Sequence, residues 1–160
     1  MTAQYFIEKL GMQKHIEGGY YKESLVSPEN ITTSDRGERK LWTSIYFLLE
    51  TGDVSHFHRL KSDEVWYYHS GSPLTIYMIS PEGELITHEL GLNIEKGQRP
   101  QVVVPKGSIF GSAQNEDGYA LVGCMVAPGF DFTDFELFTR EELLSQYKEH
   151  EEIIIKLTSK

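Results

Sequence analysis

The chain has 160 residues and a formal net charge of −9, and its Lys and Arg residues are scattered rather than clustered. So acidic a chain repels phosphate backbones and anionic lipids, which excludes nucleic acid and membrane as expected partners. The single cysteine, Cys124, excludes an intramolecular disulfide and a cysteine-based zinc site. No stretch approaches the roughly 20 apolar residues of a spanning helix, and the N-terminus lacks a secretory signal pattern. We therefore expect one cytoplasmic domain over residues 1–160.

The chain starts with a predicted amphipathic helix, residues 2–10, which ends at Gly11. Paired glycines at 18 and 19 predict a turn or bulge that leads into a strand, and residues 27–38 are predicted to form a polar loop. From residue 41 on, short apolar and aromatic runs alternate with turn residues about every 8–12 residues. The predicted strands are 41–50, 54–58, 65–69, 74–80, 84–90, 101–105, 108–114 and 119–128.

The last segment again favours a helix. Thr139 and Glu142 have the spacing of a capping box, which predicts a helix from Thr139 to about Tyr147. Eight or more short strands with regular turns are typical of an all-β sandwich or barrel. The sequence therefore predicts an all-β fold with short N-terminal and C-terminal helices.

The residues most suited to chemistry lie between Gly52 and Gly71. His56 and His58 are two positions apart on a predicted strand, so regular alternation places both on one face. A turn follows, and Glu64 begins the next strand, where pairing brings it opposite the histidines. Two imidazoles and one carboxylate suit Fe, Mn, Ni, Cu or Zn. His56, His58 and Glu64 are thus the predicted catalytic residues and the predicted metal ligands.

These motifs resemble those of the cupin superfamily. His-x-His, then Glu, then Gly is similar to the first cupin motif, and Gly97 followed by residues 105–110 is similar to the second. The chain is also similar to a branch of short, single-domain cupins, whose motifs stand here in order as EGGYY (17–21), SHFHRLKSDEVW (55–66), RPQVVVPKG (99–107) and VGCMVAPGFDFTDFEL (122–137). The resemblance implies a double-stranded β-helix, or jelly-roll barrel, a homodimer, and a pocket in the barrel mouth similar to those of nucleotide-sugar epimerases.

Two departures from the cupin pattern concern the metal. Five residues separate His58 from Glu64, where metal-binding cupins have three or four, and Phe110 stands at the position of the second motif's histidine. Phenylalanine cannot coordinate a metal. The predicted ligand set is therefore reduced to His56, His58 and Glu64. A triad of two histidines and one carboxylate can still hold iron, and a divalent Fe, Mn, Ni or Zn cofactor stays open.

Aromatic residues supply the candidate walls of the pocket. Trp66 and Tyr68 share the predicted face of Glu64, and Tyr77 and Phe110 lie on later strands. All four are predicted substrate-binding residues that would stack on a ring or sugar, and core packing is the alternative for each. The remaining histidines, which include His15, are predicted to lie on the surface or to be structurally satisfied.

Three functions are compatible with these residues. The leading one is a cupin that binds a small polar metabolite, such as a sugar or sugar nucleotide, and acts as an isomerase or epimerase. A histidine would then remove a proton next to a carbonyl, and a tyrosine would return one. The second is a metal-dependent oxygenase or isomerase that uses the His/His/Glu triad. The third is a non-catalytic ligand sensor or structural dimer.

Overall fold

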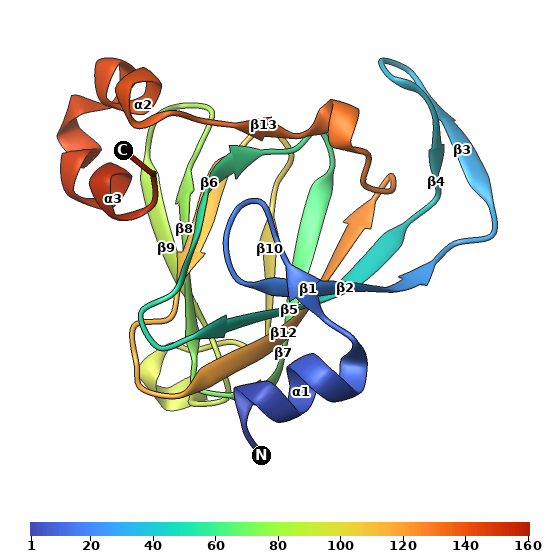
Figure 1. Ribbon diagram of the computed structural model, residues 1–160. Helices are drawn as coiled ribbons and strands as arrows, with labels where there is room; N and C mark the ends of the chain where they lie inside the picture. The colour runs from blue at the N-terminus through green and yellow to red at the C-terminus, as the bar shows by residue number, and fades with distance from the viewer.

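Two antiparallel sheets face each other across the main core in the computed structural model, which describes residues 1–160 (Figure 1). The first sheet has the order β1-β2-β5-β12-β7-β10. Its strands are β1 (Gln13–Lys14), β2 (Tyr20–Val26), β5 (Thr43–Glu50), β7 (Asp63–Gly71), β10 (Gln101–Val104) and β12 (Tyr119–Ala127). The second sheet has the order β13-β6-β11-β8-β9. Its strands are β6 (Val54–Arg59), β8 (Leu74–Ile79), β9 (Leu85–Leu90), β11 (Ile109–Ala113) and β13 (Glu136–Leu137).

The main core fills the space between the sheets. Phe47, Trp66 and Val122 come from the first sheet, and Ile76 and Phe110 come from the second; each is no more than 1 % exposed. Burial of each large apolar side chain contributes about 1.5–3 kcal/mol relative to exposure. The predicted all-β architecture is confirmed, and every predicted strand is present with shifts of a few residues at its ends.

Short helices cover the outer faces of both sheets. The helix α1 (Ala3–Leu10) is capped by Thr2 and packs on the first sheet, whereas α2 (Arg140–Gln146) and α3 (Glu151–Lys156) pack on the second. The capping box of Thr139 and Glu142 forms as predicted. Single 3₁₀ turns lie at η1 (Ile94–Lys96), η2 (Phe132–Asp134) and η3 (Lys148–His150). None of the helices has the length and hydrophobicity needed to cross a bilayer.

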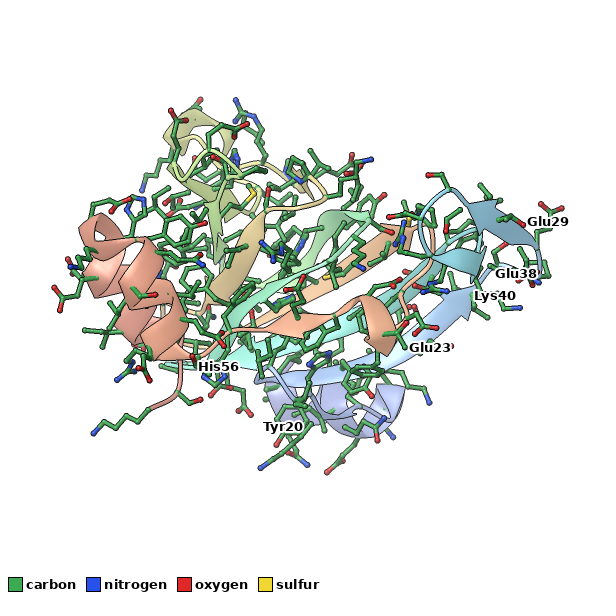
Figure 2. The ribbon with its side chains drawn as sticks, turned by 90° about the horizontal axis from the view of Figure 1, so that it is seen from above. Tyr20, Glu23, Glu29, Glu38, Lys40 and His56 are labelled. Atoms are coloured by element: carbon green, nitrogen blue, oxygen red, sulfur yellow. The ribbon has the colours of Figure 1, made fainter.

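The predicted polar loop 27–38 is wrong in part, because it contains most of a hairpin. The strands β3 (Asn30–Thr33) and β4 (Gly37–Lys40) pair with each other and form a separate two-stranded sheet. The hairpin projects from the barrel, and Glu29, Glu38 and Lys40 mark it in Figure 2. Most of its side chains are exposed, so the strands lack the apolar alternation by which a strand is recognised in sequence.

A β-bulge interrupts β6 at the predicted histidine pair. On β11, Phe110 pairs with His58 and Ser112 pairs with Ser55, so two residues of β6 stand opposite the single Gly111. Such a bulge breaks the alternation of side chains. Phe57 is consequently buried in the outer core beneath α2 and α3, whereas His58 is buried on the opposite, inner side.

Candidate functional site

A cavity with a volume of about 110 Å³ lies between the sheets at one end of the barrel. Its polar lining comes from the β1–β2 turn and from β2, β5, β6, β7 and β12. The lining residues are His15, Glu17, Tyr21, Glu23, Thr43, Ile45, Phe47, His58, Leu60, Glu64, Trp66, Cys124, Val126, Phe130, Phe132 and Phe135. The set combines four buried or half-buried His and Glu side chains with a mostly apolar wall, as small-molecule pockets commonly do.

A buried ion pair forms one side of the cavity. The Nε2 atom of His58 lies 2.9 Å from Oε2 of Glu17, and the two side chains are only 4 % and 8 % exposed. The Nδ1 atom of His58 lies 2.7 Å from the carbonyl oxygen of His56. Because a carbonyl oxygen only accepts, Nδ1 carries a proton and donates it there. Both ring nitrogens of His58 are therefore engaged.

The charges of the two groups support each other. Burial alone would raise the pKa of Glu17, but the charge and hydrogen bond of His58 hold that pKa below its usual value. Burial alone would lower the pKa of His58, but the same carboxylate raises it. The pair is thus an imidazolium and a carboxylate, joined by a charge-assisted hydrogen bond.

The β1–β2 turn holds Glu17 in this position. The carbonyl oxygen of Glu17 accepts a hydrogen bond of 2.6 Å from the backbone N–H of His56. Gly18 has a φ of 112°, and a Cβ at this position would overlap the carbonyl oxygen of Val54. Only glycine combines that backbone angle with so close an approach, so the turn lies directly against β6.

His15 supports the same turn from inside the cavity. Its Nδ1 atom accepts a hydrogen bond of 3.1 Å from the backbone N–H of Glu17, which requires this nitrogen to be unprotonated. Burial lowers the pKa of His15, so the ring is neutral. The ring packs edge-on against Tyr21 and Phe47, with centroid distances of 4.7 and 6.0 Å.

A second buried carboxyl group lines the same cavity. Glu64 is the second residue of β7, where it pairs with Val104 on one side and Val126 on the other, and it is 8 % exposed. Burial raises the pKa of Glu64 to about 8; the positive charge of His58 opposes this rise and the negative charge of Glu17 adds to it. Glu64 is therefore largely a neutral carboxylic acid at pH 7.

A buried hydrogen-bond donor in the same wall lacks a partner. Trp66 is 1 % exposed, lines the cavity, and its indole Nε1–H makes no hydrogen bond. This N–H and the Cys124 thiol lie near the Glu64 carboxyl group, but neither reaches it with regular hydrogen-bond geometry. An unsatisfied buried donor costs about 1–3 kcal/mol and is rare in native proteins.

Three phenylalanines form the mouth of the cavity. The rings of Phe130, Phe132 and Phe135 contact one another edge-on, with centroid distances between 4.9 and 6.1 Å. Phe132 is 58 % exposed although it is large and apolar. The projecting hairpin holds this segment, because Arg39 of β4 binds both carboxylate oxygens of the buried Asp134 in η2, at 2.9 and 2.8 Å.

The structure brings only part of the predicted triad together. Glu64 and His58 both line the cavity, but the bulge turns His56 to the other side of β6, and its side chain is absent from the lining. In Figure 2, His56 lies beside the C-terminal helical segment, whereas Glu23, a lining residue, lies near η2. Nowhere in the chain are three or more His, Cys, Asp or Glu side chains arranged to hold a metal ion.

The residues present do not fit the metal that the cupin pattern implies. Both ring nitrogens of His58 are already used, and the ring of Phe110 packs 4.1 Å from that imidazole at the place of the missing histidine. We therefore derive no chemical step through a metal.

Of the predicted substrate-binding aromatics, Trp66 lines the cavity and the other three do not. Tyr68 lies two residues beyond Trp66 on β7, and its hydroxyl donates to the carbonyl of Gly71. Tyr77 packs with the outer core, and its hydroxyl accepts a hydrogen bond from Asn115. Phe110 is buried behind His58. These three side chains pack with the two core clusters and do not line the cavity.

Sequence reasoning missed Glu17 and His15. Glu17 is the first residue of the EGGYY motif, where paired glycines signalled a special backbone but not a buried carboxylate. A carboxylate directly before two glycines is the signal that could have found it, because a glycine turn allows close approach to another strand. His15 had been expected to be an ordinary histidine, yet it lines the cavity.

Comparison with known proteins places the chain in a family. The family model described as "Cupin superfamily (DUF985)" matches residues 4–138, and the chain therefore belongs to this branch of the cupins. Protein SO0799 from Shewanella oneidensis is similar in structure, with a TM-score of 0.93 and 56 % identity over 99 % of this chain and 98 % of that one. A hypothetical protein from Leishmania major has a TM-score of 0.95 and 37 % identity over the full length of both chains.

A more distant relative confirms the predicted jelly roll. The oxalate decarboxylase of Bacillus subtilis has a TM-score of 0.59 at 18 % identity, over 92 % of this chain and 37 % of that one. That enzyme carries Mn(II) centres. At this identity the likeness concerns the cupin fold alone, which in general serves many unrelated functions.

Proposed function

We propose that this cupin is an isomerase or epimerase that moves a proton at a carbon next to the carbonyl group of a small metabolite. The observation that supports this function is the presence of two buried carboxyl groups, Glu17 and Glu64, in one cavity with opposite protonation states. Two titratable groups whose pKa values are pushed apart are the usual signature of an acid and a base.

The roles follow from the contacts. The carboxylate of Glu17 removes the proton on carbon, and His58 positions this carboxylate and stabilises its charge through the 2.9 Å hydrogen bond. This assignment differs from the expected histidine base, because neither nitrogen of His58 is free to accept a proton. The electron pair of the broken C–H bond forms the C=C bond of an enol, while Glu64 donates its proton to the carbonyl oxygen. With a hydroxyl on the first carbon the intermediate is an enediol: Glu17 returns its proton to the former carbonyl carbon while that hydroxyl gives its proton to Glu64, which completes an isomerisation. In an epimerisation a solvent proton adds to the other face of the first carbon, the enol proton returns to Glu64, and Glu17 releases its proton to solvent.

The test is proton exchange in D₂O with a panel of dihydroxyacetone, fructose, pyruvate and cyclohexanone, followed by ¹H NMR. We expect loss of the signal of the proton next to the carbonyl for at least one compound. Glu17→Gln and Glu64→Gln should each slow this exchange by a factor of about 10²–10⁴. His88→Gln, on the exposed face of β9, should leave the rate unchanged.

Two outcomes would contradict the proposal. Exchange that persists in Glu17→Gln would remove Glu17 as the base. Binding of a carbonyl compound without any exchange above the buffer rate would favour the non-catalytic ligand sensor instead.

A further inference from the structure

The hydrogen bond of His15 decides which of its two ring nitrogens carries the proton. Nδ1 accepts from the backbone N–H of Glu17 at 3.1 Å, so this nitrogen is unprotonated. A neutral imidazole carries one proton, which must then lie on Nε2. Burial lowers the pKa of His15, in agreement with a neutral ring. His15 therefore has one N–H donor, at Nε2.

This donor has no partner within the protein and is accessible from the cavity. Nε2 of His15 forms no hydrogen bond, and protein atoms do not enclose it as they enclose the indole Nε1 of Trp66. The His15 side chain is only 9 % exposed, and it lines the cavity. A ligand oxygen in the cavity can therefore accept a hydrogen bond from Nε2–H of His15, whereas the indole N–H is out of its reach.

The β1–β2 turn fixes the orientation of the ring. The backbone N–H of His15 donates to the carbonyl of Gly19 at 2.9 Å, and its carbonyl accepts from the N–H of Gly18 at 3.1 Å. The ring itself is held by the bond at Nδ1 and by its edge-on contacts with Tyr21 and Phe47. A donor that is fixed in advance needs little rearrangement when negative charge develops on a ligand oxygen.

The ring also lies beside the proposed base. Oε1 of Glu17 is 3.8 Å from Nδ1 of His15, on the side of the carboxylate that does not bind His58. In a carbonyl compound the oxygen is bonded to the carbon next to the one that loses its proton. A substrate whose C–H bond faces Glu17 can therefore direct its carbonyl oxygen to the imidazole of His15.

We propose that His15 is a further catalytic residue of this site, whose Nε2–H donates a hydrogen bond to the carbonyl oxygen of the substrate. Negative charge reaches this oxygen when Glu17 removes the proton on carbon, so the hydrogen bond is stronger in the transition state than in the bound substrate. The N–H bond of His15 stays intact, and Glu64 still supplies the proton of the enol. This role rests on the proposed function; the alternative is that His15 only supports the turn.

Two substitutions of His15 separate the donor from the support of the turn. In His15→Asn the amide oxygen can accept in place of Nδ1, but no donor reaches the position of Nε2. In His15→Gln the amide nitrogen reaches that position and keeps a donor there, but the acceptor for the turn is lost. His88→Asn, on the exposed face of β9, is the control.

The first measurement is proton exchange in D₂O with dihydroxyacetone, fructose, pyruvate and cyclohexanone, with kcat and KM determined separately for each variant. His15→Asn should lower kcat by a factor of about 10²–10³, as for the loss of one donor to a developing oxyanion, and should change KM little. His15→Gln should restore a large part of this loss, and His88→Asn should match the wild type.

The second measurement is ¹⁵N NMR of the imidazole rings in the wild type, which needs neither a variant nor catalysis. At neutral pH, His15 should be protonated at Nε2 and unprotonated at Nδ1. Titration with dihydroxyacetone should shift the Nε2 signal of His15 and leave that of the exposed His88 in place.

Full kcat in His15→Asn, or a loss confined to His15→Gln, would overturn the role of Nε2 and leave the proposed function intact. An unprotonated Nε2 in the free protein would also overturn it. The proposed function fails in a different way, through the absence of exchange in the wild type. The catalytic role of His15 would then fall with it, and a Nε2 signal that still responds to dihydroxyacetone would support ligand binding by His15 alone.

Discussion

Two glutamates of one cavity have opposite protonation states because their surroundings differ. Glu17 enters from the β1–β2 turn and meets an imidazolium, whereas Glu64 enters from β7 between apolar neighbouring strands. The two residues are almost equally buried, at 6 % and 8 % exposure, yet one pKa is lowered and the other is raised to about 8. Depth of burial alone therefore does not decide the protonation state of a glutamate. The charge of the neighbouring side chain, here the imidazolium of His58 beside Glu17, decides it.

The largest expected effect concerns Glu64, the carboxyl group that forms no ion pair. Glu64 has a folded pKa of about 8, above the ordinary value of 4.5. The folded state consequently holds a proton that the unfolded state loses, so this group makes stability fall as pH rises from about 4.5 to about 8 and level off above that. Glu64→Gln, which mimics the neutral acid, should abolish this fall. At pH 8.5 the variant should be more stable than the wild type by about 4 kcal/mol.

Urea unfolding at half-unit intervals between pH 4.5 and 9 measures this difference. The effect of Glu64→Gln on stability should be near zero at pH 4.5 and should grow towards pH 8. Profiles of wild type and variant that run parallel over the whole range would show that Glu64 is not held neutral in the folded protein.

The next largest effect is expected for the ion pair of Glu17 and His58. Glu17→Gln keeps the shape of the side chain but leaves His58 buried without its counter-charge, so stability at pH 7 should fall by about 3 kcal/mol. The sign of the pH dependence is also opposite to that of Glu64. The contribution of Glu17, with its lowered pKa, is present above about pH 4.5 and is lost as pH falls through the folded value.

Glu23→Gln is the matched control, because Glu23 lines the same cavity but is exposed. Its substitution should change stability by less than about 0.5 kcal/mol. An effect of Glu17→Gln no larger than that of Glu23→Gln would mean that the ion pair does not stabilise the fold.

The fold could be predicted from the sequence because its signals are local. Apolar runs, turn residues and the capping box at Thr139 each concern a few neighbouring residues, and each is confirmed. The prediction that Glu64 and Trp66 share one face of the strand is also confirmed, because burial alternates from residue to residue at this end of β7. The hairpin β3–β4 escaped prediction because most of its side chains are exposed and it contacts the barrel through arginines rather than apolar residues, so no apolar pattern marks its strands.

The site could be predicted only in part, because its decisive features are long-range. The bulge that separates His56 from His58 arises opposite Gly111, a residue of another strand more than 50 positions away. The ion pair joins His58 to Glu17, which lies in a turn at the far edge of the other sheet. Strand periodicity describes one segment at a time, and it therefore gives the orientation of Glu64 but not the partner that His58 meets.

The smallest expected effect is that of added metal. It tests whether His58 and Glu64 can bind a metal ion together. A metal bound by His58 and Glu64 would have to displace Glu17 from His58 Nε2, because Nδ1 faces a carbonyl oxygen. A bound metal at 100 times its dissociation constant would add about 2.7 kcal/mol of stability, or several degrees in a chain of this size. We expect Fe(II), Mn(II), Ni(II) and Zn(II) at 1 mM to move the melting temperature by less than about 1 °C. A larger rise that disappears in His58→Gln but persists in His88→Gln would show instead that His58 leaves Glu17 for a metal.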